Sequence, residues 1–235
     1  MNYLVTLNIN DCLCSNSRNS MLDACSRWGC KFHEITENYV GDQNVCFNKL
    51  VGIKRLTEEA DVDRLMYLDA DMLIRSDAPN PLVLFNDDKT YAVRDCKDSS
   101  TEDEFLYWKS MVVESWLLSV HEKLKLDVDI NRLVDTCKDW FFNAGMFLMS
   151  AKQNRPNIDL FIRNIPSFPV NGRIEQAMWN YILKNSENMV YIDRTWNMLE
   201  PDLSESMKNF IYHFTGFRSY VPTLKERILT YNWKV

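Results

Sequence analysis

The sequence has 235 residues, of which 46% are hydrophobic and 26% are charged, and this size suits one large or two small globular domains. Its formal net charge is -6 and no basic stripe stands out, which argues against a protein that grips nucleic-acid phosphates. No apolar run approaches the roughly 18 residues of a membrane span. Residues 1–6 lack a basic region followed by an apolar one, so we expect no signal peptide.

Cysteine usage indicates a reducing compartment. The chain has 7 cysteines, an odd number, and 3 histidines, and it contains no C-x-x-C pair of the kind that begins many zinc sites. Reduced thiols that pack as small apolar side chains explain this pattern best. We therefore expect a cytoplasmic protein. Because no repeat, low-complexity tract or linker interrupts residues 1–235, we also expect a single domain, which the sequence allows to be part of a longer polypeptide.

Apolar periodicity near the start of the chain predicts strands that alternate with helices. Residues 3–8 and 31–35 are strand-like, and apolar residues at i, i+3, i+4, i+7 spacing before Gly29 predict a helix between them. Residues 45–56 give a second helical pattern that leads into an apolar strand at 65–68. This alternation is typical of a parallel sheet with helices on its faces.

The rest of the chain contains further elements of both kinds. The prolines in residues 76–81 predict a turn, since proline interrupts both a helix and a strand ladder. An apolar run at 141–149 is broken by Asn143 and Gly145, which indicates close approach of a ligand or another backbone. The other predicted elements are a strand at 91–93, a helix with a capping box at 101–104, a helix from Glu175, a strand at 189–192 and a helix at 224–229.

Two carboxylates, Asp69 and Asp71, come directly after the apolar run 65–68. Carboxylates are rarely buried unless they are paired or bind a cation. In an open α/β sheet, ligands gather at the carboxyl ends of the strands. The pair therefore predicts a divalent metal site at the end of a central strand.

Six blocks that include this pair occur in order along nearly the whole chain. They are Phe47-Asn-Lys49, Tyr67-Leu-Asp-Ala-Asp-Met-Leu-Ile74, Phe142-Asn-Ala-Gly145, Glu175-Gln176, Trp196-Asn197 and His213-Phe-Thr-Gly216. The ordered set resembles glycosyltransferase family 8, which includes glycogenin, galactinol synthase and bacterial lipopolysaccharide galactosyltransferases. The resemblance implies a GT-A fold, which is a single Rossmann-like α/β domain with a mostly parallel central sheet flanked by helices.

The resemblance also implies an activity. It is the retaining transfer of a hexose from a UDP-sugar to a saccharide or protein-linked glycan acceptor, with Mn²⁺ or Mg²⁺ as the metal. Asp69, Asp71 and His213 would be the protein's metal ligands, and such a mixed oxygen and imidazole shell suits Mn²⁺. The ion would act as a Lewis acid on the departing UDP.

The resemblance further implies which residues bind the donor. On the nucleotide side these are Leu7, Ile9, Asn10 and Leu13, and on the diphosphate and sugar side they are Lys49, Asp69, Ala70, Arg94, Asn143, Gly145, Gly216 and Arg218. Asp95, Glu175 and Gln176 match the positions that line the reacting sugar, with Gln176 nearest the anomeric carbon. Because an amide is a poor nucleophile, we expect stabilisation of an oxocarbenium-like state rather than a covalent intermediate.

The sequence departs from the family pattern at two places. Glu175 stands where an aspartate is commoner, and the usual ending H-x-x-G-x-x-K-P-W is replaced by His213-Phe-Thr-Gly-Phe-Arg-Ser-Tyr220, in which Arg218 supplies the positive charge.

Two other functions remain as alternatives. One is a sugar-nucleotide-binding domain without turnover, and the other is a haloacid-dehalogenase-like phosphatase, whose D-x-D motif usually follows the first strand and continues with Thr or Val where this chain has Leu73. The transferred sugar, the acceptor and the oligomeric state stay open.

Overall fold

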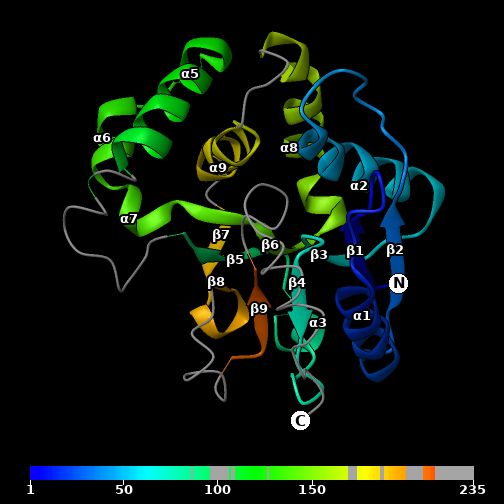
Figure 1. The fold of residues 1–235 in the computed structure, drawn as a ribbon. Helices are drawn as coiled ribbons and strands as arrows, with labels where there is room; N and C mark the ends of the chain where they lie inside the picture. The colour runs from blue at the N-terminus through cyan, green and yellow to red at the C-terminus, as the bar shows by residue number, and fades with distance from the viewer. Residues whose placement is uncertain are drawn as a thin grey trace.

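The computed structural model describes residues 1–85, 87–95, 106, 109–125, 127–168, 174–185, 188–199 and 209–214. Within these ranges a central sheet carries helices on both faces (Figure 1). The predicted helix start at 101–104 and the predicted helix at 224–229 lie outside the described residues. Among the described helices, none is long and apolar enough to cross a membrane.

The first part of the chain forms the predicted parallel β-α-β-α-β unit. Its elements are β1 (Tyr3–Leu7), α1 (Ser15–Trp28), β2 (Lys31–Ile35), the 3-10 turn η1 (Val45–Phe47), α2 (Asn48–Glu59) and β3 (Arg64–Leu68). As predicted, α1 ends at Gly29, whose left-handed φ of 66° suits a residue without a Cβ atom. The second predicted helix starts as η1 because the side chain of Asn44 accepts a hydrogen bond from the backbone N–H of Cys46.

The second part of the chain supplies the remaining elements. They are β4 (Met72–Ile74), α3 (Pro81–Leu84), β5 (Thr90–Arg94), the π-helix η2 (Lys109–Glu114), α5 (Ser115–Leu124), α6 (Ile130–Asp135), α7 (Cys137–Trp140), β6 (Phe142–Ser150), α8 (Ala151–Asn164), η3 (Ile165–Ser167), α9 (Glu175–Asn185), β7 (Met189–Tyr191), η4 (Arg194–Trp196), β8 (Met198–Leu199) and β9 (Ile211–His213). One prediction needs correction. Pro81 does not continue the turn but opens α3, because a proline fits the first turn of a helix and the side chain of Asn80 caps this one.

Two sheets organise the described residues. The large sheet has six strands in the order β2-β1-β3-β6-β5-β7, and the small one has three in the order β4-β9-β8. The expected mostly parallel sheet is confirmed, except that β6 runs antiparallel to both β3 and β5. Leu68 at the end of β3 pairs with Met146. The reversed direction of β6 therefore brings Asn143 and Gly145 to the edge of the sheet where β3 ends.

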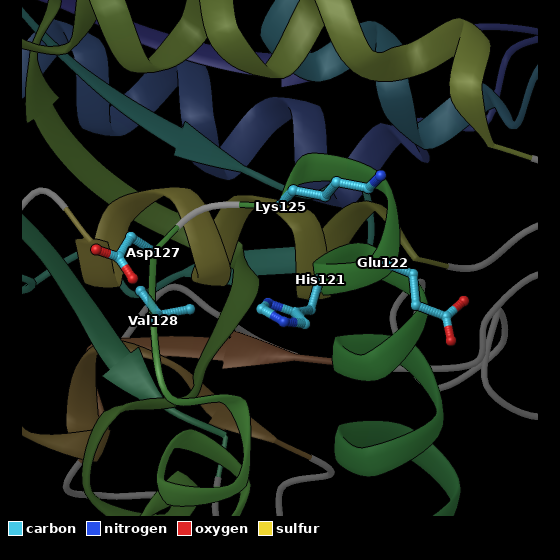
Figure 2. Close-up of a pocket in the computed structure, with 5 residues that line it drawn as sticks. All are labelled: His121, Glu122, Lys125, Asp127 and Val128. Carbon is cyan, nitrogen blue, oxygen red and sulfur yellow. The ribbon is translucent and has the colours of Figure 1, made fainter.

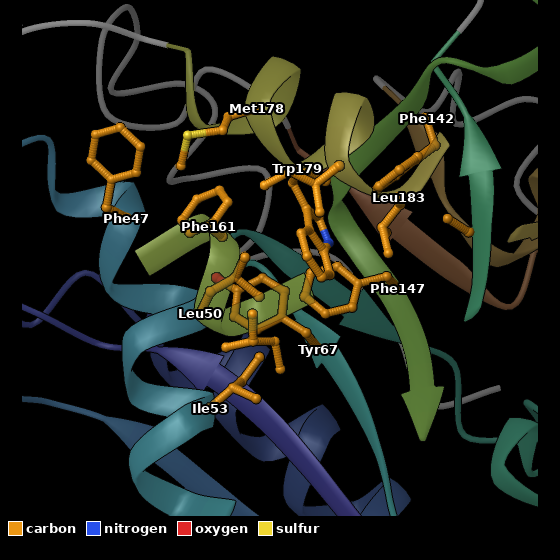
Figure 3. Close-up of a cluster of buried hydrophobic side chains, with 14 of the residues drawn as sticks. Phe47, Leu50, Ile53, Tyr67, Phe142, Phe147, Phe161, Met178, Trp179 and Leu183 are labelled. Atoms are coloured by element: carbon orange, nitrogen blue, oxygen red, sulfur yellow. The ribbon is translucent and has the colours of Figure 1, made fainter. Parts of the chain in front are cut away.

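Both faces of the central sheet are buried. Leu65 and Tyr67 of β3 belong to one apolar cluster, whereas the alternate residues Met66 and Leu68 belong to another, as expected for a strand whose side chains point to opposite faces in turn. The first cluster is rich in aromatic rings and includes Phe147, whose ring stacks on Tyr67 with centroids 5.1 Å apart (Figure 3). Burial on both faces explains why these strands read as continuous apolar runs.

Candidate functional site

The candidate site lies where β3 ends and β4 and β9 meet. Asp69 follows β3 directly and Asp71 precedes β4. β4 pairs antiparallel with β9, with Met72 opposite His213, and the N–H of Phe214 donates to the carbonyl of Asp71 at 3.0 Å. This pairing brings a histidine from near the end of the chain to the two aspartates.

The three predicted metal ligands converge. Each of Asp69, Asp71 and His213 offers a ligand atom, and these atoms lie within 4.8 Å of one another. Nε2 of His213 is 3.3 Å from Oδ1 of Asp71 and 4.0 Å from Oδ2 of Asp69. Oδ1 of Asp71 is buried and has no partner in hydrogen-bond geometry among the described residues. Two carboxylates, one of them with an unsatisfied buried oxygen, and one imidazole fit a divalent cation such as Mn²⁺.

Lys49 is buried beside this cluster, with 3% of its surface exposed. Its Nζ donates to the carbonyl of Ala144 at 3.1 Å and lies 3.0 Å from Oε1 of Glu175 and 3.4 Å from Oδ1 of Asp69. An ammonium group has three hydrogens, and three protein oxygens surround this one. Lys49 therefore ties helix α2 to the end of β3, to β6 and to the start of α9.

Each ionisable group of the cluster changes the pKa of its neighbours. Burial opposes the charge of Lys49, but Asp69 and Glu175 raise its pKa above the ordinary lysine value. Burial would raise the pKa of Asp69, yet Lys49 and His213 hold it below its usual value. Burial likewise opposes protonation of His213, but Asp71 and Asp69 raise its pKa. The acidic groups outnumber the buried lysine, which favours binding of a further cation.

The pKa of Glu175 is raised above its usual value, whereas that of Asp69 is lowered. Burial raises the pKa of Glu175, Lys49 opposes this rise, and Asp69 adds to it. Its Oε1 also lacks a partner in hydrogen-bond geometry among the described residues, although Nζ of Lys49 is near. A buried carboxyl group of this kind is well suited to accept a hydroxyl hydrogen of a polar ligand.

Gly145 allows these groups to approach one another. A Cβ atom at this position would lie 2.5 Å from Cε1 of His213 and 2.8 Å from both Oδ1 of Asn143 and Oδ2 of Asp69. The carbonyl of Gly145 also accepts the N–H of Asp69 at 2.8 Å. The sequence predicted close approach of a ligand or another backbone at this glycine, and the structure shows that side chains make the close approach.

A network of amides joins the remaining predicted residues. The carboxylate of Asp95 accepts hydrogen bonds from Nδ2 of Asn143 at 3.3 Å and from Nε2 of Gln176 at 2.6 Å. Oδ1 of Asn143 accepts from Nδ2 of Asn197 at 3.2 Å, and Oδ1 of Asn197 lies 3.1 Å from Nδ1 of His213. Asn197 is the residue of this network to which the sequence analysis assigned no role. Its only signal was membership of the Trp196-Asn197 block.

The predicted nucleotide-side residues lie at the end of β1 and directly after it, at the same sheet edge. β1 runs parallel to β3, so its end is beside Asp69. Leu7 and Ile9 belong to one apolar cluster, and Leu13 is partly buried against the other cluster. Asn10 is exposed and has a positive φ of 58°, so it forms a turn at this edge.

The other predicted donor residues divide into three groups. Ala70 is partly exposed between the two aspartates. Arg94 instead donates to the carbonyl of Asp139 at 3.0 Å, and its guanidinium lies 5.0 Å from the ring centroid of Tyr191. The structure therefore does not bring Arg94 into the amide network. Gly216 and Arg218 lie outside the described residues.

A separate pocket is formed near the end of α5. It has a volume of about 570 Å³ and is lined by His121, Glu122, Lys125, Asp127 and Val128 (Figure 2). None of these five is a predicted site residue, and Nδ1 of His121 is already within 2.6 Å of the hydroxyl of Tyr181. Within the described part of the chain, the group formed by Asp69, Asp71 and His213 is the one suited to a metal.

Comparison with known proteins gives relatives by structure alone, since no protein-family model and no curated protein matches the chain. A glycosyltransferase involved in the glycosylation of the major capsid of PBCV-1 is similar over 98% of this chain and 99% of its own, with a TM-score of 0.64 and 11% identity. The galactosyltransferase LgtC, in complex with donor and acceptor sugar analogues, is similar over 91% of this chain and 87% of its own, with a TM-score of 0.53 and 16% identity. The glycosyltransferase GlyE of Streptococcus pneumoniae TIGR4 covers 99% of this chain, with a TM-score of 0.54 and 13% identity. The chain therefore has the GT-A fold that the sequence resemblance implied and that these glycosyltransferases share.

Proposed function

We propose that this chain is a metal-dependent, retaining glycosyltransferase that moves a hexose from a UDP-sugar to a saccharide or protein-linked glycan. The observation that carries the proposal is the convergence of Asp69, Asp71 and His213 at the edge of the sheet where β3 ends. The glycosyltransferases of the same fold support a sugar-transfer reaction. We take residues 1–235 as a single catalytic domain.

The metal would be held by Asp69, Asp71 and His213, with Mn²⁺ favoured and Mg²⁺ as the alternative. When bound, the cation neutralises the charge that develops on the UDP leaving group. The protein's own part is to present the ligand atoms in one arrangement. Tyr67 assists by donating its hydroxyl hydrogen to Oδ1 of Asp69 at 2.8 Å, and Nζ of Lys49 lies 3.4 Å from the same oxygen.

Asp95, Glu175 and Gln176 would contact the donor sugar. The carboxyl groups of Asp95 and Glu175 are buried, so sugar hydroxyl groups are suitable hydrogen-bond donors for them. Gln176 is fixed at both ends of its amide, because Nε2 donates to Asp95 and Oε1 accepts the N–H of Ala144 at 3.1 Å. A fixed amide dipole supports stabilisation of positive charge at the anomeric carbon rather than nucleophilic attack.

Calorimetric titration with UDP, with and without Mn²⁺, tests the proposal. We expect binding that depends on the metal, followed by slow Mn²⁺-dependent hydrolysis of one member of a panel of UDP-sugars. The absence of metal-dependent UDP binding would contradict the proposal. Metal-dependent binding without hydrolysis or transfer would favour the second candidate, a sugar-nucleotide-binding domain. The phosphatase alternative is disfavoured because the fold is that of the glycosyltransferases.

A further inference from the structure

A chain of hydrogen bonds runs from Asp95 through Asn143 and Asn197 to His213, and the donor and acceptor of each bond are fixed. A carboxylate can only accept hydrogen bonds, so Asn143 must turn its Nδ2 toward Asp95. The backbone N–H of Gly145 donates to Oδ1 of Asn143 at 2.9 Å. A backbone N–H is always a donor, and this contact therefore sets the orientation of Asn143 independently of Asp95.

The orientation of Asn143 determines that of Asn197. Because Oδ1 of Asn143 is an acceptor, Asn197 must present its Nδ2 to it, and the bond is 3.2 Å long. Oδ1 of Asn197 is then directed at Nδ1 of His213, at 3.1 Å. An amide oxygen cannot donate, so a neutral imidazole forms this hydrogen bond only with its hydrogen on Nδ1.

We propose that Asn197 is the positioning residue that holds neutral His213 as the Nδ1–H tautomer and so leaves the lone pair of Nε2 for the metal. The inference rests on the proposed function for the identity of the metal ligands. Nε2 is the nitrogen that lies 3.3 Å from Asp71 and 4.0 Å from Asp69. A hydrogen on Nε2 alone would set two acceptors, Nδ1 and the amide oxygen, against each other. Oδ1 of Asp71 is an acceptor too, so the bare Nε2 of the proposed tautomer is matched when a cation lies between these two atoms.

Burial makes this control effective. Asn197 is 2% exposed, His213 3% and Asn143 9%, so bulk water has little access to replace a lost partner. An unmatched pair of acceptors in such a place is costly. Hydrogen-bond partners of metal-bound histidines commonly fix the tautomer and ring orientation in this manner.

The same carboxylate also orients Gln176. Oδ2 of Asp95 accepts from Nε2 of Gln176, while the N–H of Ala144 fixes the other end of that amide. The buried carboxylate of Asp95 therefore orients the side-chain amides of both Asn143 and Gln176. The hydrogen bonds through Asn143 lead from Asp95 to His213, the proposed metal ligand. The other hydrogen bond leads directly to Gln176, which is proposed to face the sugar.

The tautomer is tested in protein saturated with UDP and the diamagnetic ion Mg²⁺. Nitrogen NMR of protein labelled with ¹⁵N-histidine shows 3 imidazoles, and His33→Gln and His121→Gln variants assign them. We expect Nδ1 to carry a hydrogen and Nε2 to carry none. A spectrum with the hydrogen on Nε2, or with a mixture of tautomers, would overturn the inference whatever the metal affinity.

Two variants of Asn197 test the consequence for the metal. Asn197→Leu has a similar volume but cannot accept the imidazole hydrogen, and we expect Mn²⁺ affinity to fall by about 10- to 100-fold with a mixed tautomer. Asn197→Asp loses the donor to Oδ1 of Asn143 but keeps an acceptor for the imidazole hydrogen, and it should keep the Nδ1–H tautomer. Asn164→Leu, which alters a half-buried asparagine of α8 whose Nδ2 donates to the carbonyl of Leu160, is the matched control and should bind Mn²⁺ as the unmodified protein does.

Mn²⁺ affinity is measured by electron paramagnetic resonance of the free ion in the presence of UDP, with thermal unfolding as the check of folding. Unchanged affinity and a retained tautomer in folded Asn197→Leu would refute the role of Asn197. If the unmodified protein binds no Mn²⁺, the metal site and the proposed function fail. A protein that binds Mn²⁺ but carries the imidazole hydrogen on Nε2 would refute the tautomer alone, so the two failures are distinguishable.

Discussion

Nζ of Lys49 lies 3.0 Å from Oε1 of Glu175, and both side chains are buried. The contact joins the first turn of α2 to the first residue of α9. A buried charge that loses its partner is much more costly than an exposed one. This pair therefore connects the stability of the fold with the arrangement of the site.

Replacement of Lys49 should destabilise the protein strongly. Lys49→Met leaves Asp69 and Glu175 without their shared cation, and we expect a loss of about 3–5 kcal/mol in the free energy of unfolding. Urea denaturation of the metal-free protein measures it. The double variant Lys49→Met/Glu175→Gln removes one of the two carboxylates that are left without a cation, and it should recover part of the lost free energy of unfolding. Equal stability of Lys49→Met and the unmodified protein would contradict the role of this contact.

Mn²⁺ affinity should rise with pH around the pKa of His213. The metal and the proton compete for Nε2, and the neighbouring aspartates raise the pKa of His213 above its usual value of about 6.5. While the imidazole is protonated, we expect affinity to increase roughly tenfold per pH unit, with release of one proton per ion. Calorimetry in buffers of different ionisation enthalpy counts that proton. His213→Gln should remove this pH dependence.

The stability of the metal-free protein should change with pH in the opposite direction. A raised pKa in the folded state means that folding favours protonated His213. Its stabilising contribution is therefore complete below the unfolded-state pKa of about 6.5 and is lost as the pH rises through the folded-state pKa. Chemical denaturation at a series of pH values measures this. A His213→Gln variant whose stability follows the same curve would assign the effect to other groups.

Asp71→Asn should abolish metal-dependent donor hydrolysis without loss of the fold. Oδ1 of Asp71 makes no hydrogen bond to the described residues, so its charge has little structural role apart from the contact with His213. Circular dichroism and thermal unfolding check the fold, and the release of free sugar from the donor measures hydrolysis. Unchanged hydrolysis in Asp71→Asn would remove this residue from the metal site.

Gly145→Ala should damage the site and the fold together. The added methyl group would meet His213, Asn143 and Asp69 at 2.5 to 2.8 Å, and overpacking of this kind costs about 1–3 kcal/mol. We also expect weaker Mn²⁺ binding, because the clash involves two proposed ligands. Gly41→Asn is the control, since Gly41 has open space around it and a φ of 60° that asparagine tolerates. A Gly145→Ala variant with normal stability and metal affinity would contradict the close approach.

The sequence alone determined the local elements and the kind of chemistry. Apolar periodicity predicted β1, α1, β2 and β3 within about a residue at most boundaries. The reason is that the buried face of a strand or helix determines the spacing of apolar residues along the sequence. The D-x-D pair predicted a metal site because carboxylates after a buried strand need a cation. The presence of Asn143 and Gly145 inside an apolar run predicted close approach at that position, where a Cβ atom on Gly145 would meet three side chains.

Only the tertiary structure decided which groups face one another. Periodicity carries no information on strand direction, so the reversal of β6, which brings Asn143 and Gly145 to the metal edge, was not predicted. Lys49 is directed at Asp69 and Glu175, and Arg94 is directed away from the site at the carbonyl of Asp139. Both orientations depend on partners distant in sequence. The position of Asn197 between His213 and Asn143 depends on strand pairing in the same way. Hydrogen-bond direction is a property of groups in space, and local sequence does not record it.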